Sequence, residues 1–187
     1  MKIVAGLHRG RTLAAPKGLT ARPTAARARE ALFSILSSKG MFDDDGLDVL
    51  DCFAGTGALG LEALSRGAER AVFIEQDPAS LAALAANIET LGEDDRVHVI
   101  RADARRPPKA PHPCHLIFLD PPYGKDLVAP TLTALGTNGW LAENAVVVAE
   151  VGAEENPAPP RGFTLTDNRT YGAAKFLILE FAGVARD

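Results

Sequence analysis

Residues 117–123, which read Ile-Phe-Leu-Asp-Pro-Pro-Tyr, combine an apolar run with a carboxylate, two prolines and an aromatic ring. Asp120 supplies an anionic acceptor, and Pro121 and Pro122 fix two φ angles and leave a stiff turn with free carbonyl oxygens. Tyr123 adds a flat face on which a nucleobase can stack. Two acceptors and a stacking ring can hold the exocyclic amino group of a flipped base. The stretch therefore predicts chemistry on such an amino group.

The nitrogen of a nucleobase amino group is a poor nucleophile, because its lone pair is delocalised into the ring. Asp120 can orient this nitrogen and stabilise the positive charge that develops on it during the reaction. The alternative is an ordinary turn at the end of a strand with an exposed tyrosine, because Pro and Asp are common turn residues.

A strand must hold Asp120 in place. Residues 117–119 are the kind of short apolar run that ends a strand buried on both faces of a parallel sheet. Ligands of open α/β sheets bind at the carboxyl ends of such strands. We therefore expect Asp120 at the edge of the sheet where a ligand binds.

A glycine-rich turn follows another predicted strand, residues 47–53. Gly55, Gly57 and Gly60 satisfy G-x-G-x-x-G, a motif that NAD sites share, so the glycines alone do not identify the cofactor. Asp51 stands four residues before Gly55, where it would repel a pyrophosphate but could help hold a cationic ammonium. NAD sites instead leave the helix N-terminus open for phosphates. The turn therefore favours S-adenosylmethionine over NAD.

The remaining pattern alternates strands with helices. Glu75 ends a predicted strand, residues 71–75, roughly twenty residues after the glycines, where an acid can accept hydrogen bonds from ribose hydroxyls. Further strands are expected over residues 97–100, 114–119, 145–151, 163–170 and 175–181, and helices from the N-cap Thr24, over residues 58–66, from Asp77-Pro78 and over residues 126–135. Residues 105–113 contain four prolines and should be irregular. This order predicts an α/β fold of the Rossmann-like type.

Length and composition bound the class of protein. A chain of 187 residues with 47% hydrophobic residues suits one substantial core. No stretch is long enough to span a bilayer or to serve as a signal peptide, so we expect a soluble, cytoplasmic protein. Cys52 and Cys114 form no disulfide framework, and His112 and His115 beside Cys114 lack a second ligand pair at zinc-site spacing. We expect no metal ion.

The net charge of −4 is unevenly distributed. Residues 1–39 hold eight Lys or Arg and one acidic residue, whereas the remainder is strongly acidic. A basic segment on an acidic body is typical of a protein in which one face meets phosphates, although a solvated charged surface would look the same. We expect residues 1–20 to form a basic hairpin extension, with strands around Gly6 and Gly10, and residues 21–187 to form the main domain.

Several of these motifs resemble one family. Asp-Pro-Pro-Tyr after an apolar strand resembles the catalytic motif of amino-group methyltransferases that use S-adenosylmethionine, and Asp51, Gly55 and Gly57 meet their Asp-x-x-x-Gly-x-Gly pattern. With Arg-Pro-Thr-x-x-Arg-x-Arg-Glu-x-Leu-Phe in residues 22–33 and a C-terminal Tyr-Gly followed by Lys175, nearly the whole chain is similar to the RsmD-type family. That family methylates the N2 of a guanine in 16S ribosomal RNA. Relatives usually carry Val and Asn where this chain has Ala28 and Ser34, so this chain lacks the side chain for any role tied to that Asn.

The resemblance implies a class I methyltransferase fold with a seven-stranded, mostly parallel sheet and helices on both faces. It implies direct transfer of a methyl group from S-adenosylmethionine to guanine N2 in 16S rRNA, within a small subunit or an assembly intermediate, by a monomer. The expected base-holding and catalytic residues are Asp120, Pro121, Pro122 and Tyr123. The expected cofactor-binding residues are Asp51, Phe53, Gly55, Gly57, Glu75, Gln76, Asp103 and Ala104. The expected RNA-binding residues are Arg9, Arg11, Arg22, Arg27, Arg29, Lys125 and Lys175.

Some alternatives stay open. Asp103, which by resemblance meets the adenine of the cofactor together with Ala104, could instead cap a turn. Adenine N6 is the nearest competitor for the methylated atom, because the same tetrapeptide can hold either amino group. An NAD-dependent oxidoreductase and a non-catalytic RNA-binding module are the rivals from other classes. A thiolate adduct is not expected, since neither Cys52 nor Cys114 is placed for attack.

Overall fold

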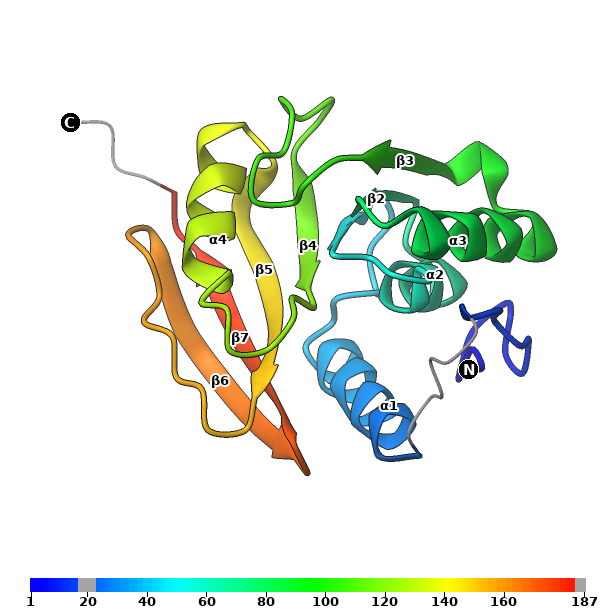
Figure 1. Cartoon of the computed structure of the whole chain (residues 1–187), viewed down its shortest axis with the longest axis horizontal. Helices are drawn as coiled ribbons and strands as arrows, with labels where there is room; N and C mark the ends of the chain where they lie inside the picture. The colour runs from blue at the N-terminus through cyan, green and yellow to red at the C-terminus, as the bar shows by residue number, and fades with distance from the viewer. Residues whose placement is uncertain (17–22, 184–187) are drawn as a thin grey trace.

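The computed structural model describes residues 1–16 and 23–183, which form one sheet flanked by helices (Figure 1). The strands are β1 Asp48–Cys52, β2 Arg70–Glu75, β3 Val97–Arg101, β4 Cys114–Leu119, β5 Leu141–Gly152, β6 Phe163–Tyr171 and β7 Ala174–Phe181. The helices are α1 Pro23–Ser38, α2 Ala58–Ser65, α3 Pro78–Leu91 and α4 Val128–Thr137, with a short 3-10 helix η1 Asp94–Arg96.

The seven strands lie in the order β3-β2-β1-β4-β5-β7-β6. The first five strands of the chain run parallel, and β7 pairs antiparallel with both β5 and β6. This arrangement confirms the predicted Rossmann-like, mostly parallel sheet of a class I methyltransferase. The strand order reverses between β1 and β4, and such a switch point is where open α/β sheets bind their ligands.

Alternate residues of the central strands enter two hydrophobic layers. In β4, Leu116 and Phe118 pack into the layer that contains α1, α2 and α3, whereas Ile117 and Leu119 pack into the layer that contains α4. Because a strand presents successive side chains to opposite faces, a run of apolar residues is what a sheet covered on both sides requires. Figure 1 shows α2 and α3 on one side of the sheet and α4 on the other.

Most element boundaries differ from the predictions by one or two residues, and two of the differences have a clear physical reason. Helix α1 begins at Pro23, so Thr24 is not its N-cap, because proline at the first helical position already has the required φ and needs no N–H partner. Strand β5 begins at Leu141 rather than at residue 145. Its first residues reach Cys114 across an irregularity in the register, and Glu143 and Asn144 there are exposed. The apolar pattern therefore marked only the buried part of this strand.

Residues 1–16, which we call the N-terminal arm, pack on the α1–α3 side of the sheet. Lys2 and Thr12 form a single antiparallel bridge within the described residues, so the predicted hairpin is present only in this minimal form. Ile3 and Leu13 are buried in the same layer as α1 and α2. The division into an extension of residues 1–20 and a main domain stays a prediction, since residues 17–22 lie outside the described part.

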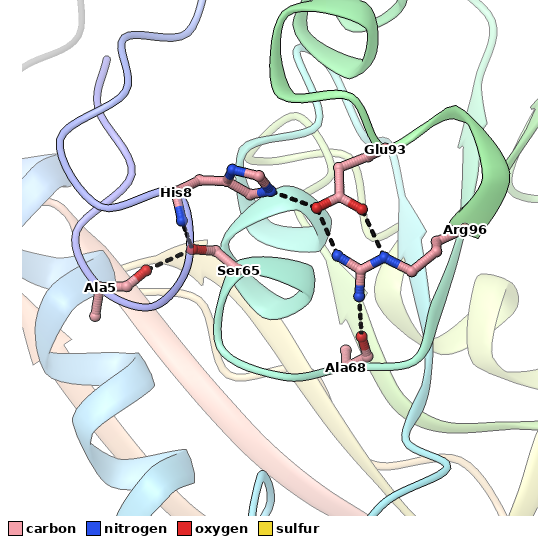
Figure 2. Close-up of polar contacts among 6 residues, drawn as sticks. All are labelled: Ala5, His8, Ser65, Ala68, Glu93 and Arg96. Carbon is pink, nitrogen blue, oxygen red and sulfur yellow. Dashed lines mark hydrogen bonds and ion pairs between the residues drawn. The ribbon is translucent and has the colours of Figure 1, made fainter.

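Polar contacts fasten the arm to the carboxyl-terminal ends of α2 and α3 (Figure 2). The Ser65 hydroxyl accepts from the His8 backbone N–H at 2.9 Å and donates to the Ala5 carbonyl at 2.6 Å. The His8 ring contacts the Glu93 carboxylate, which also accepts from the Arg96 guanidinium, at 2.7 Å for Nε. This arrangement gives the buried polar groups of the junction partners within the protein.

A glycine allows this close approach. A Cβ atom on Gly6 would lie 1.7 Å from the Ser65 carbonyl oxygen, and Gly6 has a φ of +80°. A side chain at this position would therefore push the arm off α2. Of the described residues, none belongs to a helix that is both long and apolar enough to cross a membrane.

Candidate active site

A cavity of about 460 Å³ lies at the carboxyl ends of the central strands. Asp51 lines it from β1, Phe53 and Gly55 line it from the glycine-rich turn, and Asp120 and Tyr123 line it from the Asp-Pro-Pro-Tyr corner. The two turns meet because Cys52 of β1 lies opposite Leu119 of β4 in the parallel register. The structure thus brings together residues that are nearly seventy positions apart in the chain.

The glycine-rich turn has strained backbone where a ligand could approach. Phe53 has a φ of 57°, which is uncommon for a residue with a Cβ atom. Gly57 has a φ of +79°, and a Cβ atom there would lie 2.3 Å from Leu84 Cδ1 of α3. The second glycine therefore permits close packing of the turn on α3. Gly55, in contrast, has open space where its Cβ would be.

Asp51 is a buried carboxylate with few partners. Its side chain is 1% exposed, and Oδ2 accepts from the Gly60 N–H at 2.9 Å. Burial raises the pKa of Asp51 well above its usual value; the Gly60 hydrogen bond opposes this, and the charges of Asp120 and Glu75 add to it. Among the described residues it forms no ion pair. Such a group suits a cationic ligand, as predicted for the ammonium of an amino acid.

Glu75 connects the end of β2 to the glycine-rich turn. Its Oε2 accepts from the Gly55 N–H at 2.8 Å, and its Oε1 accepts from the N–H groups of Gln76 and Asp77 at 2.7 and 2.8 Å. A carboxylate offers about four acceptor positions, so about one stays free. The three amides hold the carboxylate in place beside Gly55 of the cavity. Gln76 itself is exposed.

Asp103, which follows β3, is engaged with its own loop. It accepts from the Arg105 backbone N–H at 2.9 Å and from the Arg105 guanidinium at 2.6 Å, and this side-chain hydrogen bond lowers the pKa of Asp103. The structure therefore contains the contact of the turn-capping alternative, in which Asp103 bonds to its own loop. Ala104 is buried, and neither residue lines the cavity. Their contact with adenine stays a prediction.

Asp120 stands directly after β4 with its side chain open to the cavity. Although it is open on that side, the surrounding protein displaces water, and this loss of hydration together with the charge of Glu150 raises the pKa of Asp120 to about 7. Tyr123 is 44% exposed, and its hydroxyl donates to Glu150 Oε1. The ring is thus available for stacking. The stacking prediction gave the hydroxyl no role, but in the structure the hydroxyl bonds to Glu150.

Glu155 braces the same corner from the loop after β5. Its Oε1 accepts from the Gly124 N–H at 2.8 Å and its Oε2 from the Gly152 N–H at 2.6 Å. Pro121 and Pro122 line a smaller cavity, about 150 Å³, which shares Tyr123 and Glu150 with the larger one. The two prolines therefore shape the corner without facing the larger cavity.

The predicted RNA-binding residues fall into three groups. Arg9, Arg11, Arg27 and Lys125 are exposed, and none of them lines the cavity. Arg22 lies outside the described residues. Arg29 and Lys175 are 7% exposed, so the prediction that both belong to the phosphate-facing surface conflicts with their burial. Lys175 Nζ donates to Asn156 Oδ1 at 2.9 Å, and its strand β7 lies inside the sheet, which explains the burial.

Arg29 lines the cavity instead. Its guanidinium donates to the Lys2 carbonyl at 2.7 Å and contacts the sulfur of Met1, while its Nε has no acceptor among the described residues. Burial lowers the pKa of Arg29, partly offset by the charge of Glu62. Arg29 was expected among the RNA-binding residues, and it is buried instead because Met1 and Lys2 of the N-terminal arm cover its side chain.

Sequence reasoning missed Glu150, which lines the cavity at the end of β5. The signal was an acidic residue at the carboxyl end of an otherwise apolar run, residues 145–151, and the run was interpreted only as a buried strand. An acid in a central parallel strand is costly to bury, so its presence indicates a site at the strand end.

Comparisons with known proteins agree with this geometry. Residues 1–180 match a family model described as "Conserved hypothetical protein 95". The chain is 36% identical over 184 residues to the Ribosomal RNA small subunit methyltransferase D of Escherichia coli, which covers 96% of this chain and 89% of the relative. It is 33% identical over 185 residues to the protein of the same name from Haemophilus influenzae, covering 96% and 93%. The solved structure of the Escherichia coli protein yhhF, named as a methyltransferase, superposes with a TM-score of 0.83 at 36% identity and covers 98% of both chains.

Proposed function

Since the chain belongs to the RsmD-type family of methyltransferases, we propose that it transfers a methyl group from S-adenosylmethionine to the N2 amino group of a guanine in 16S rRNA. The observation that carries this proposal is that one cavity is lined by both the glycine-rich turn and the Asp-Pro-Pro-Tyr corner. A methyl donor on the first and an amino group on the second would face each other there.

The residues of the turn fit the cofactor. S-adenosylmethionine, when bound, supplies a methyl group on a positively charged sulfur. Asp51, a buried carboxyl group without an ion pair among the described residues, suits the ammonium of its amino acid part, and Arg29, a buried guanidinium whose Nε has no acceptor among those residues, suits the carboxylate. Glu75 is held by three amides beside Gly55 and keeps an acceptor for a ribose hydroxyl.

Asp120 performs the chemical role at the other wall of the cavity. It accepts a hydrogen bond from the amino group and thereby directs the nitrogen lone pair toward the methyl group. Transfer of the methyl group would convert the bound cofactor to S-adenosylhomocysteine and would place positive charge on this nitrogen, which the Asp120 carboxylate would stabilise. The methylated nitrogen then loses a proton, which Asp120 can accept because its pKa is raised to about 7.

Labelled cofactor tests this function directly. The protein is incubated with labelled S-adenosylmethionine and with naked 16S rRNA, with assembled small subunits or with an assembly intermediate, and the RNA is digested and analysed by mass spectrometry. We expect N2-methylguanosine at one position in at least one of the three substrates. N6-methyladenosine would transfer the proposal to the adenine alternative. If none of the three substrates yields a methylated nucleoside although the protein binds S-adenosylhomocysteine, the remaining alternative is a non-catalytic RNA-binding module.

A further inference from the structure

Glu150 lies beside Asp120 on the neighbouring strand. In the parallel register, Leu119 of β4 lies opposite Ala149 of β5, so Asp120 and Glu150 follow at adjacent positions. Side chains alternate along a strand, and Val148 packs in the layer of α1 whereas Ala149 packs in the layer of α4. Glu150 therefore faces the α1 side, where it lines the same cavity as Asp120.

The surroundings of Glu150 leave it as an acceptor. The Tyr123 hydroxyl donates to Oε1, and Oε2 has no hydrogen bond within the described residues. The charge of Glu150 contributes to the raised pKa of Asp120, so the two carboxylates interact through space. No cation among the described residues pairs with either of them. Asp120 and Oε2 of Glu150 therefore offer two adjacent acceptors to a ligand that brings two adjacent donors.

Guanine brings two such donors. On its Watson–Crick edge, the N2 amino group is next to N1–H, so two donors stand side by side. Adenine and cytosine instead place a ring nitrogen with a lone pair next to the amino group, and that lone pair would face a carboxylate. A site built to accept a hydrogen bond discriminates strongly against a base that cannot donate it, because the acceptor stays desolvated and unpaired.

We propose that Glu150 is a specificity-determining residue that accepts the N1–H of the flipped guanine while Asp120 accepts from its N2 amino group. This inference rests on the proposed function, since it concerns the base held at the same site. Tyr123 then has two roles, because its ring stacks on the base and its hydroxyl orients Glu150. The pair of carboxylates would thus separate guanine N2 from adenine N6, which the Asp-Pro-Pro-Tyr motif alone leaves open.

The test uses 2-aminopurine, which keeps the amino group at C2 but has an acceptor at N1. A synthetic segment with guanine or 2-aminopurine at the methylated position is ligated into the RNA substrate, and kcat/KM is measured for both with the wild-type protein, Glu150→Gln and Glu143→Gln. The side-chain amide that Glu150→Gln introduces can donate to N1 of 2-aminopurine, whereas Glu143 is exposed on the same strand away from the cavity. The other differences between the two bases are common to all three proteins and cancel when their ratios are compared.

We expect the wild-type protein and Glu143→Gln to prefer guanine equally, and the preference to fall by about 10- to 100-fold in Glu150→Gln. An unchanged ratio in Glu150→Gln, including an equal loss of both rates, would overturn the role of Glu150 and leave the proposed function intact. If the variant reacts too slowly for kcat/KM to be measured, its affinity for each of the two RNAs is measured with S-adenosylhomocysteine bound. The ratio of these affinities is then compared among the three proteins in the same way. A wild-type protein that methylates no guanine would instead refute the proposed function itself.

Discussion

Two carboxylates of the molecule have neighbours of opposite kinds. Glu62 lies beneath the N-terminal arm among hydrogen-bond donors, whereas Asp120 lies at the cavity beside another carboxylate. Glu62 is 0% exposed, and its oxygens accept from the N–H groups of Val4 and Ala5 at 2.7 and 3.1 Å and from Arg66 Nε at 2.8 Å. Asp120 has the anionic Glu150 as its neighbour and a raised pKa. A buried charge is costly unless it is paired, so paired charges serve the fold and unpaired ones indicate a ligand.

The arginines of the two regions repeat the contrast. The Arg96 guanidinium donates to both oxygens of Glu93 and to the Ala68 carbonyl, so each of its three nitrogens has an acceptor within the protein (Figure 2). Arg29 is more deeply buried, yet its Nε lacks an acceptor among the described residues. The junction of the arm is complete without a ligand, whereas the cavity is complete only with one. Each of the following predictions tests this difference.

The largest effect should come from Glu62→Ala, which leaves two backbone N–H groups of the arm and the Arg66 guanidinium without their acceptor. Removing one partner of a buried ion pair typically costs several kcal/mol, and we expect a loss of about 3 kcal/mol in the free energy of unfolding. Urea denaturation measures it. Glu69→Ala, an exposed neighbour in sequence, should stay within about 0.5 kcal/mol. A loss below about 1 kcal/mol for Glu62→Ala would contradict the structural role of the arm junction.

Asp120→Asn should have the opposite effects, a large loss of activity without a loss of stability. It keeps the shape of the side chain but loses the charge that stabilises the transition state, so single-turnover methyl transfer with saturating RNA should fall roughly 100-fold or more. Because the folded protein disfavours the ionised form of Asp120, the variant should be at least as stable as the wild-type protein at pH 8. Transfer at the wild-type rate would make the Asp-Pro-Pro-Tyr corner an ordinary turn.

The same contrast explains which features the sequence could predict. Strands β1, β2 and β4 and the positions of Asp51 and Asp120 follow from local patterns, namely apolar runs that end on a carboxylate or a glycine turn. Contacts between distant segments had no such signal. The burial of Arg29 depends on the N-terminal arm, and the approach of Glu150 to Asp120 depends on the register of β4 and β5. Periodicity describes one element at a time, so it assigns a face but not the partner that covers it.

Glu75 stands between the two classes, since it has three amide partners and does not itself line the cavity, but one of those partners is Gly55, which does. If its free acceptor position holds a ribose hydroxyl, Glu75→Ala should weaken S-adenosylmethionine binding by about 1–3 kcal/mol, the scale of charge-assisted hydrogen bonds. Isothermal titration calorimetry measures the affinity. Glu89→Ala, on the exposed face of α3, is the matched control and should bind as the wild-type protein does. Unchanged affinity in Glu75→Ala would make Glu75 a purely structural carboxylate.

The raised pKa of Asp120 predicts a dependence of turnover on pH. The group is an acid that acts in its ionised form, so activity is present above its pKa of about 7 and is lost as the pH falls through that value. Single-turnover rates should therefore drop about tenfold per unit on the acid side and level off above neutrality. Glu150→Gln removes a neighbouring charge and should shift the midpoint to lower pH. A rate that is level down to about pH 5 would show that Asp120 is already ionised there.

The smallest effects concern the basic side chains, and they separate surface charges from cavity charges. Arg9 is exposed, so if it neutralises an RNA phosphate, Arg9→Ala should flatten the plot of log affinity for RNA against log salt by about one unit. Lys109→Ala, an exposed base on the acidic body, is the control and should leave the slope unchanged. Arg29→Ala should also leave the slope unchanged, because its guanidinium is buried, yet it should weaken S-adenosylhomocysteine more than 5′-methylthioadenosine, which lacks the amino acid part. A flatter salt plot for Arg29→Ala with both ligands bound normally would return Arg29 to the RNA surface and remove it from the cofactor site.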